Sequence, residues 1–284
     1  MPDRSQSDEA AAARAARGVV PDQSDSAATG PTPAPGIRQR ADFRLDADSL
    51  RGRVVLVTGA HGGLGAAAAV AAARCGATLV LLGRRVPKLN RVYDAIEAAG
   101  GKQPALYPLD LEGATPTDYA DLAERIEAEC GRLDGILHAA AAFKGLTPLA
   151  LTEPEDWLGA LHVNLSAPLL LTRACLPLLE KSADAAVVFV ADDPERVGHA
   201  YWGGYGVAKY GLLGLVPMLA EELAGGPVRV SALLPGPMRT SLRGRAWFGE
   251  DPGAVPPPDE YAGAAIHLLS AAGAGLRGHI LRVQ

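Results

Sequence analysis

The 284-residue chain has few aromatic residues and few cysteines. Aromatic residues make up only 5% of it, so a core must be built from alanine, valine and leucine, which suits buried parallel strands covered by alanine-rich helices. The three cysteines, Cys75, Cys130 and Cys175, are odd in number and widely spaced, which fits neither a disulfide framework nor a zinc site. We expect them to be small apolar packing residues in a reducing cytoplasm, and we expect no metal site.

Excess positive charge and long apolar runs are also missing. The formal net charge is -5 and the pI is near 5.7, which argues against a nucleic-acid partner or an anionic membrane surface. No uncharged apolar run is long enough to span a bilayer. Near the N-terminus, Arg14 and Arg17 interrupt an alanine-rich stretch that follows Asp8 and Glu9, so this segment resembles neither a secretory signal nor a transit peptide. We therefore expect a cytoplasmic protein that binds neither nucleic acid nor membranes.

The composition changes near residue 49. Residues 1–48 are rich in alanine, serine, aspartate, glycine and proline, and residues 29–36 alone hold three prolines and two glycines, a composition typical of an extended, unpacked chain. We predict a disordered N-terminal tail over residues 1–48 and one folded domain over residues 49–284.

Within residues 49–284, apolar runs typical of strands alternate with segments typical of helices. The expected strands lie at residues 54–57, 78–82, 104–109, 135–139, 186–190, 228–234 and 280–283. The expected helices lie at residues 64–75, 87–99, 119–130, 154–179, 205–223 and 260–271, with irregularities at Pro168 and Pro177. Because strand–helix–strand units cross over with a right hand, we predict a single α/β domain. Its core would be a Rossmann-type, doubly wound parallel sheet of about seven strands with helices on both faces.

A glycine-rich loop joins the first predicted strand to the first helix. Gly59, Gly63 and Gly65 have no Cβ, so the backbone can turn tightly and approach a pyrophosphate, while the helix N-terminus beyond supplies free N–H groups. Such loops also serve as plain connections, but this one has the strand–loop–helix context that phosphate binding requires. We predict that the loop binds a dinucleotide and that His61 and Leu64 line the phosphate site.

Two guanidinium groups follow the second predicted strand, where a ribose-binding acid would otherwise be expected. Arg84 and Arg85 favour a 2′-phosphate over a ribose diol, so NADP(H) is the preferred cofactor and NAD(H) stays possible. A solvated basic pair is the alternative interpretation. Asp110, after the third strand, could meet the adenine amino group.

Tyr205 and Lys209 lie four residues apart, which places a phenol and an ammonium group on one face of a helix. A nearby cation stabilises a phenolate, so the pair is suited to proton transfer. A tyrosine and a lysine at this spacing also occur by chance.

These residues, in this order, resemble the short-chain dehydrogenase/reductase family over residues 50–283. The resemblance rests on the glycine loop, Asp110, Asn164, the Tyr205–Lys209 pair, Pro235, Gly236 and Thr240. Residues 82–84, 133–138, 202–203 and 239–240 look like the YciK-like bacterial oxidoreductases within it.

The resemblance implies roles for the matching residues. Tyr205 would be the general acid and base, Lys209 would tune it and bind the nicotinamide ribose, and Asn164 would hold a water of a proton relay. Thr240 would contact the carboxamide beside a turn shaped by Pro235 and Gly236. Residues 238–258 would form a lid over a partly apolar small-molecule substrate. The helices near residues 154–179 and 205–223 would pack between the subunits of a homodimer or homotetramer.

The sequence departs from the family pattern at two places. Residues 138–141 read His-Ala-Ala-Ala where the family has Asn-Asn-Ala-Gly, so side-chain braces near the nicotinamide are lost. Asp192 stands where a serine hydroxyl would polarise the substrate carbonyl. A carboxylate about 4 Å from the developing oxyanion would oppose it by roughly 4 kcal/mol at an effective dielectric near 20, which is about three decades in rate.

Two functions remain open on these residues. The first is an NADP(H)-dependent oxidoreductase that interconverts a carbonyl and an alcohol, with Asp192 counted among the catalytic residues and either neutral or turned aside. The alternative is an NADP-binding pseudoenzyme, a sensor or oligomeric scaffold with little turnover. Tyr205, Lys209 and Asn164 favour the enzyme, whereas Asp192 favours the alternative.

Overall fold

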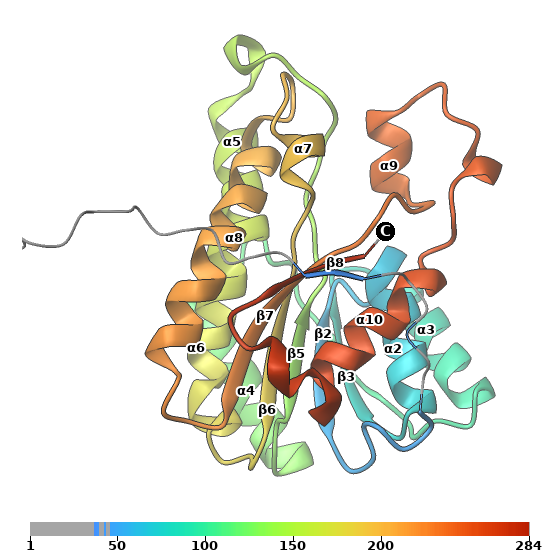
Figure 1. The fold of residues 1–284 in the computed structure, drawn as a ribbon, viewed down its shortest axis with the longest axis vertical. Coiled ribbons are helices and arrows are strands. Elements are labelled where there is room, and N and C mark those ends of the chain that lie inside the picture. Colours follow the sequence, from blue (N-terminus) through green and yellow to red (C-terminus); the bar gives the residue numbers. More distant parts are fainter. Residues whose placement is uncertain (1–36, 40–42, 44–45, 284) are drawn as a thin grey trace, which may run out of the picture. The chain divides into compact units, whose positions relative to one another are not determined.

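One parallel β-sheet carries the fold (Figure 1). The computed structural model describes residues 37–39, 43 and 46–283. The strands are β1 (Ile37–Gln39), β2 (Val54–Thr58), β3 (Thr78–Gly83), β4 (Ala105–Pro108), β5 (Gly135–His138), β6 (Ala185–Val190), β7 (Val228–Leu234) and β8 (Ile280–Val283). They lie in the order β1-β8-β7-β6-β5-β2-β3-β4, and every neighbouring pair is parallel.

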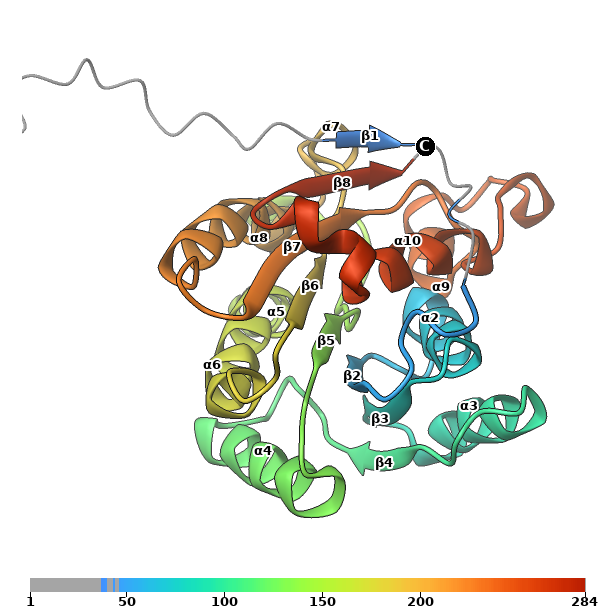
Figure 2. The ribbon, with the colours of Figure 1, turned by 60° about the horizontal axis from the view of Figure 1, so that its bottom comes forward.

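Helices cover both faces of the sheet (Figure 2). They are α2 (Gly63–Arg74), α3 (Val86–Ala98), α4 (Pro116–Cys130), α5 (Pro154–Leu161), α6 (Ala167–Leu179), α7 (Pro194–Val197), α8 (Gly203–Glu222), α9 (Ser241–Ala246) and α10 (Asp259–Leu269). Strand β2 shows why two layers form: Val55 and Val57 pack in the same core cluster as α2 and α10, while Val54 and Leu56 pack with α4 and α6. Among the described residues, no helix combines the length and apolar character needed to cross a membrane.

The strand order creates a crevice at one edge of the sheet. The chain runs from β2 outward to β3 and β4, and then returns to β5 on the other side of β2. At such a switch point the loops after the two central strands diverge, and ligands of open α/β sheets bind between them. The ends of β2 and β5 therefore place Gly59 and Ala139 at the mouth of this crevice.

The predicted parallel sheet with helices on both faces is confirmed, and all seven expected strands are present. The segment expected as one helix over residues 154–179 is divided. Helix α5 ends at Leu161, a π-helical turn follows at His162–Ser166, and α6 begins at Ala167. The irregularity therefore lies ahead of Pro168, whereas Pro177 lies inside α6.

Strand β1 is an element that the sequence did not predict. The predicted tail, residues 1–48, lies largely outside the described residues, but residues 37–39 pair with β8 and extend the sheet to eight strands. Phe43 then lies 5.0 Å from the ring of His267 on α10, measured between ring centroids.

The buried carboxylate of Asp134 ties the start of β2 to the segments before β5 and β6. It accepts hydrogen bonds from the Val54 N–H at 2.8 Å, from the Ser182 hydroxyl at 2.6 Å and from the Arg132 guanidinium at 2.6 and 2.8 Å. Burial alone would raise the pKa of Asp134, but the bonds from Arg132, Ser182 and Val54 outweigh it and hold that pKa below its usual value.

We expect Asp134→Ala to lower the free energy of unfolding by about 3 kcal/mol, because it leaves the buried Val54 N–H without a partner and removes the shorter hydrogen bond of the Ser182 hydroxyl. Since the folded-state pKa is depressed, this stabilisation exists above the unfolded-state pKa and is lost as pH falls through the folded-state pKa. Urea unfolding at pH 7 and in acid measures both effects. Ser182→Ala is the milder control, and equal stability of Asp134→Ala and wild type would contradict the assignment.

Candidate active site

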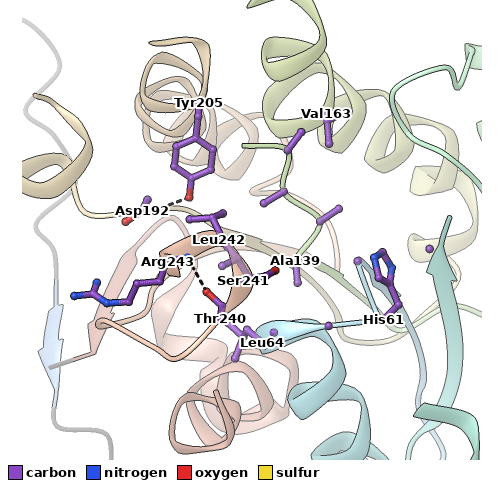
Figure 3. A pocket seen from close by; sticks show the side chains of 18 of the residues that line it. His61, Leu64, Ala139, Val163, Asp192, Tyr205, Thr240, Ser241, Leu242 and Arg243 are labelled. Atoms are coloured by element: carbon purple, nitrogen blue, oxygen red, sulfur yellow. Dashed lines mark hydrogen bonds between the residues drawn. The ribbon is translucent and has the colours of Figure 1, made fainter. Parts of the chain in front are cut away.

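A cavity of about 290 Å³ occupies the switch point of the sheet (Figure 3). Its walls come from the ends of β2, β3, β5, β6 and β7, from the first turn of α2, and from α8 and α9. In Figure 3, His61 lies on one side of this cavity and Tyr205 with Asp192 on the other. The cavity therefore joins the glycine loop to the phenol–ammonium pair.

The glycine loop fits tightly against its neighbours. Gly59 has φ of +64°, and a Cβ there would lie 2.6 Å from the Ala140 Cα. A Cβ on Gly65 would lie 2.5 Å from the Gly59 carbonyl oxygen. The loop backbone is thus bare and faces the cavity ahead of the N-terminus of the twelve-residue helix α2, as a pyrophosphate site requires.

Cations gather at the end of the cavity beyond β3. Arg84 Nη1 lies 3.6 Å from Asp110 Oδ2 and 4.0 Å from Glu112 Oε2, and Lys88 also lines the cavity. His61 Nδ1 is buried and has no hydrogen-bond partner among the described residues. Burial, Lys88 and the neighbouring arginines lower the pKa of His61, so its imidazole is held neutral. This basic end, with a bare ring nitrogen, suits a phosphate group.

The phenol of Tyr205 donates a hydrogen bond to Asp192. Its oxygen lies 2.7 Å from Asp192 Oδ2, and both side chains are buried (Figure 3). Burial raises the pKa of Tyr205 well above its usual value, and the charge and hydrogen bond of Asp192 raise it further. Tyr205 is therefore a protonated phenol with a carboxylate as its acceptor.

Arg196 supplies the counter-ion that the sequence analysis missed. Its Nε and Nη2 lie 2.9 and 2.5 Å from Asp192 Oδ1, and the Asp193 N–H donates to the same oxygen at 2.7 Å. Asp193 begins α7, and its side chain also accepts a hydrogen bond at 2.6 Å from Arg282 on β8. Asp192 is thus neither turned aside nor without a partner.

Lys209 lies on the other side of the phenol. Its Nζ donates to the Val190 carbonyl at 2.7 Å and lies 5.6 Å from the centroid of the Tyr205 ring. Burial lowers the pKa of Lys209 to about 8, although the Asp192 carboxylate opposes that shift. Burial and Lys209 lower the pKa of His138 to about 3, so this histidine adds no charge.

Asn164 braces the segment after β5. Its side chain donates to the Ala142 and Ala160 carbonyls, both at 2.8 Å, and accepts from the Ala142 N–H at 3.1 Å. The Thr58 hydroxyl likewise accepts from the Ala140 N–H at 3.2 Å. The expected loss of braces at residues 138–141 is therefore partly offset by residues from β2 and from the π-helical turn.

Most of the predicted site residues meet in one place. The cavity is lined by Gly59, His61, Gly63, Leu64, Arg84, Asp110, Asp192, Tyr205, Lys209, Pro235, Gly236 and Thr240. Gly65 and Asn164 lie behind its wall. Arg196, Lys88 and Glu112 line it as well, and of these Arg196 could have been found from its spacing of four residues from Asp192.

Comparison with known proteins agrees with this geometry. The family model for short chain dehydrogenase matches residues 53–250. The chain is 39% identical over 222 residues to the uncharacterized oxidoreductase YciK of Escherichia coli (strain K12), covering 78% of this chain and 88% of YciK. A short chain dehydrogenase from Pseudomonas syringae is 43% identical, has a TM-score of 0.82, and is matched over 86% of this chain and 99% of that one. A short chain dehydrogenase from Shigella flexneri 2a str. 301, solved in complex with NADP, is 35% identical with a TM-score of 0.80, over 84% and 99% of the two chains.

The chain belongs to the short chain dehydrogenase family of oxidoreductases. Within that family it is similar to YciK, as its motifs predicted.

The ion pair between Asp192 and Arg196 should contribute to the free energy of unfolding. We expect Arg196→Gln to lower the free energy of unfolding by about 3 kcal/mol, because a charged carboxylate stays buried without its partner. Asp192→Asn introduced into Arg196→Gln should recover at least about 1 kcal/mol of this loss. Urea unfolding of the two single variants and the double variant measures the coupling. Additive effects would show that the two side chains do not interact.

Proposed function

We propose that this protein is an NADP(H)-dependent oxidoreductase that interconverts a carbonyl and an alcohol on a small molecule, with NADPH preferred over NADH. The observation that carries the proposal is the hydrogen bond from Tyr205 to Asp192, beside Lys209, inside the cavity that the glycine loop enters. A phenol hydrogen-bonded to a carboxylate, with an ammonium group 5.6 Å from the centroid of the phenol ring, provides a proton path, which a nucleotide-binding scaffold does not need.

The cavity fits the cofactor. A Cβ at Gly59 or Gly65 would collide with backbone, and Arg84 and Lys88 line the same cavity beside His61. The loop backbone, Arg84 and Lys88 would hold the phosphates, and Asp110 the adenine. Bound nicotinamide would supply the hydride acceptor or donor. The NADP complex of the Shigella flexneri relative supports the preference for the phosphorylated dinucleotide.

Tyr205 need not ionise to work as the acid and base. In alcohol oxidation, the substrate hydroxyl proton would pass to the Tyr205 oxygen as the phenol proton passes to Asp192 Oδ2, which lies 2.7 Å away. In carbonyl reduction both protons would move the other way. Arg196 stays on Oδ1, so the oxygen that faces Tyr205 remains free to take the proton. The Arg196 guanidinium then reduces the electrostatic repulsion between the Asp192 carboxylate and an oxyanion that forms on the substrate.

The same contacts also support the alternative of a pseudoenzyme that binds NADP as a sensor or scaffold. Asp192 is fully engaged by Tyr205, Arg196 and the Asp193 N–H, and no hydroxyl stands at its position. The two functions differ in whether Tyr205 can exchange its proton with a substrate.

We also propose a cytoplasmic homodimer or homotetramer. Val207, Tyr210 and Met218 form an exposed stripe on α8, and Leu158 is exposed on the adjacent α5. Large apolar side chains that recur along a helix surface mark a contact face. This is the pair of helices for which the sequence predicted subunit packing.

Kinetics of three variants test the catalytic proposal. NADPH oxidation with a panel of aldehydes, ketones and quinones, and the reverse reaction with the matching alcohols, should fall by at least about a hundredfold in Tyr205→Phe and in Asp192→Asn. Tyr210→Phe on the same helix should stay near wild type, since its hydroxyl contacts Pro194 on the surface. Tight NADPH binding without turnover, together with turnover gained by Asp192→Ser, would establish the pseudoenzyme instead.

The pH profile separates the carboxylate path from a phenolate. We expect alcohol oxidation to stay nearly constant from about pH 6 to pH 7.5, because the raised pKa of Tyr205 keeps the phenol protonated throughout. Above pH 8 the rate should decline as Lys209, with its pKa of about 8, loses its charge. Asp192→Ser should move the optimum to higher pH. A wild-type rate that rises tenfold per pH unit would instead indicate a phenolate base.

Cofactor choice should depend on Arg84. We expect Arg84→Ala to weaken NADPH binding by at least about tenfold and to leave NADH binding nearly unchanged, because the guanidinium would contact the 2′-phosphate. Isothermal titration with both nucleotides measures this, and Arg91→Ala, an exposed arginine on α3, is the matched control. Equal losses for the two nucleotides would refute the assignment.

A further inference from the structure

A second cavity, of about 310 Å³, lies against the phenol of Tyr205. Tyr205 lines both cavities, whereas Phe143, Trp202 and Arg245 line the second one and not the first. An inference from this cavity rests on the proposed function, because it takes Tyr205 as the place where the substrate reacts.

Aromatic rings form one wall of the second cavity. The ring of Phe143 is stacked on that of Trp202 with centroids 5.1 Å apart, and it lies 5.2 Å from the ring of Tyr205. Trp202 also contacts Trp247, at 5.4 Å between centroids. Three of these rings line the second cavity and the fourth, Trp247, lines the first, in a chain of which aromatic residues are only 5%. A planar apolar group would pack well against this wall.

Backbone strain marks the same place. Tyr201 has φ of +78°, and it is the one non-glycine residue with positive φ in the described part of the chain. Its carbonyl accepts a hydrogen bond from the Thr147 N–H at 2.9 Å, which holds the segment before α8 against the loop after β5. Such a conformation costs about 1 kcal/mol or more and is concentrated at ligand sites. Tyr201 lines the second cavity.

Arg245, on α9, brings an uncompensated charge to this aromatic wall. Its Nη1 donates to the Phe143 carbonyl at 2.5 Å, and it has no carboxylate within ion-pair distance among the described residues. Four other cations line the cavity: Arg84, Arg85, Lys88 and Lys144. Lys144 is paired with Asp156, and Arg84 lies near Asp110 and Glu112. Arg85 and Lys88 lie at the N-terminus of α3, whereas Arg245 contacts the aromatic wall itself through the Phe143 carbonyl. Arg245 therefore keeps further guanidinium N–H groups for a ligand.

We infer that Arg245 is a specificity-determining residue and that the substrate combines an apolar, planar body with an anionic group, a carboxylate or a phosphate. The aromatic wall would hold the body with its carbonyl or alcohol at Tyr205. The guanidinium, whose planar fork matches both oxyanions, would hold the charge. Arg84 and Lys88 line both cavities, and in the proposed function their charge is used by the cofactor phosphates, whereas Arg245 lines only the second cavity.

Arg245 could instead serve to fasten α9 to the loop after β5 through the Phe143 carbonyl. Arg245→Gln distinguishes the two roles, because glutamine keeps an N–H donor for that carbonyl and removes the charge. Arg245→Lys keeps the charge and loses the fork.

Ligand binding to the NADP⁺-saturated protein tests the inference through the fluorescence of Trp202 and Trp247. Benzoate and phenyl phosphate should bind at least about tenfold more tightly than benzamide. The anion that binds more tightly shows whether the site prefers a carboxylate or a phosphate. Arg245→Gln should abolish the difference, Arg245→Lys should retain part of it, and NADP⁺ affinity should be unchanged in both. Equal binding of benzamide and the anions, or an unchanged preference in Arg245→Gln, would overturn the inference.

A matched substrate pair gives a second readout. With 4-carboxybenzaldehyde, Arg245→Gln should raise KM at least about tenfold and leave kcat unchanged, whereas the methyl ester of this aldehyde should show no change. A fall in kcat for both compounds would assign Arg245 to fastening the lid and refute a role in anion recognition. Failure of the proposed function is distinguishable, because it would appear as an absence of turnover with both aldehydes while the anion preference in fluorescence persists.

Discussion

The carboxylate of Asp192 joins three elements that meet above the sheet: the end of β6, helix α7 and helix α8. One oxygen accepts the Tyr205 phenol proton in a hydrogen bond, and the other is held by the Arg196 guanidinium and the Asp193 N–H. Because burial makes an unpaired charge costly, each partner depends on the others for its position. The protonation of the tyrosine, the charge near the substrate and the shape of the cavity all follow from this arrangement.

Sheet topology explains why these groups face a cofactor. Parallel strands bring all of their C-terminal ends to one edge, and the divergence of the chain between β2 and β5 leaves a crevice there. The glycines in the loop after β2 have no side chains to fill this crevice. Asn164 and Thr58 hold the segment after β5 on its other side by hydrogen bonds. The two cavities, which we propose for the cofactor and the substrate, consequently share Tyr205 as a common wall.

Much of the fold could be predicted because strands buried on both faces are continuous apolar runs, and glycine marks most of their ends. The residues proposed to bind the cofactor could be chosen for the same reason, since their spacing reflects strand–loop–helix geometry, and most of them line one cavity. The pairing of Asp192 was not predicted, although Arg196 lies four residues further on, because that spacing brings the two side chains together only where residues 194–197 form the short helix α7. Strand β1 was not predicted because three residues are too few to show the alternation of apolar and polar residues typical of a strand. Arg245 was not predicted because the aromatic wall brings together residues that are far apart in the sequence.

The contact between Arg282 and Asp193 extends this network to the last strand of the sheet. Arg282 lies on β8, beside β1, and reaches across to the residue that begins α7. A peptide or a neighbouring molecule that displaced β1 or shifted β8 would therefore move the start of α7 and, through the Asp193 N–H, the carboxylate under the phenol. The margin of the sheet formed by β1 and β8 is in this way mechanically linked to the hydrogen bond between Asp192 and Tyr205.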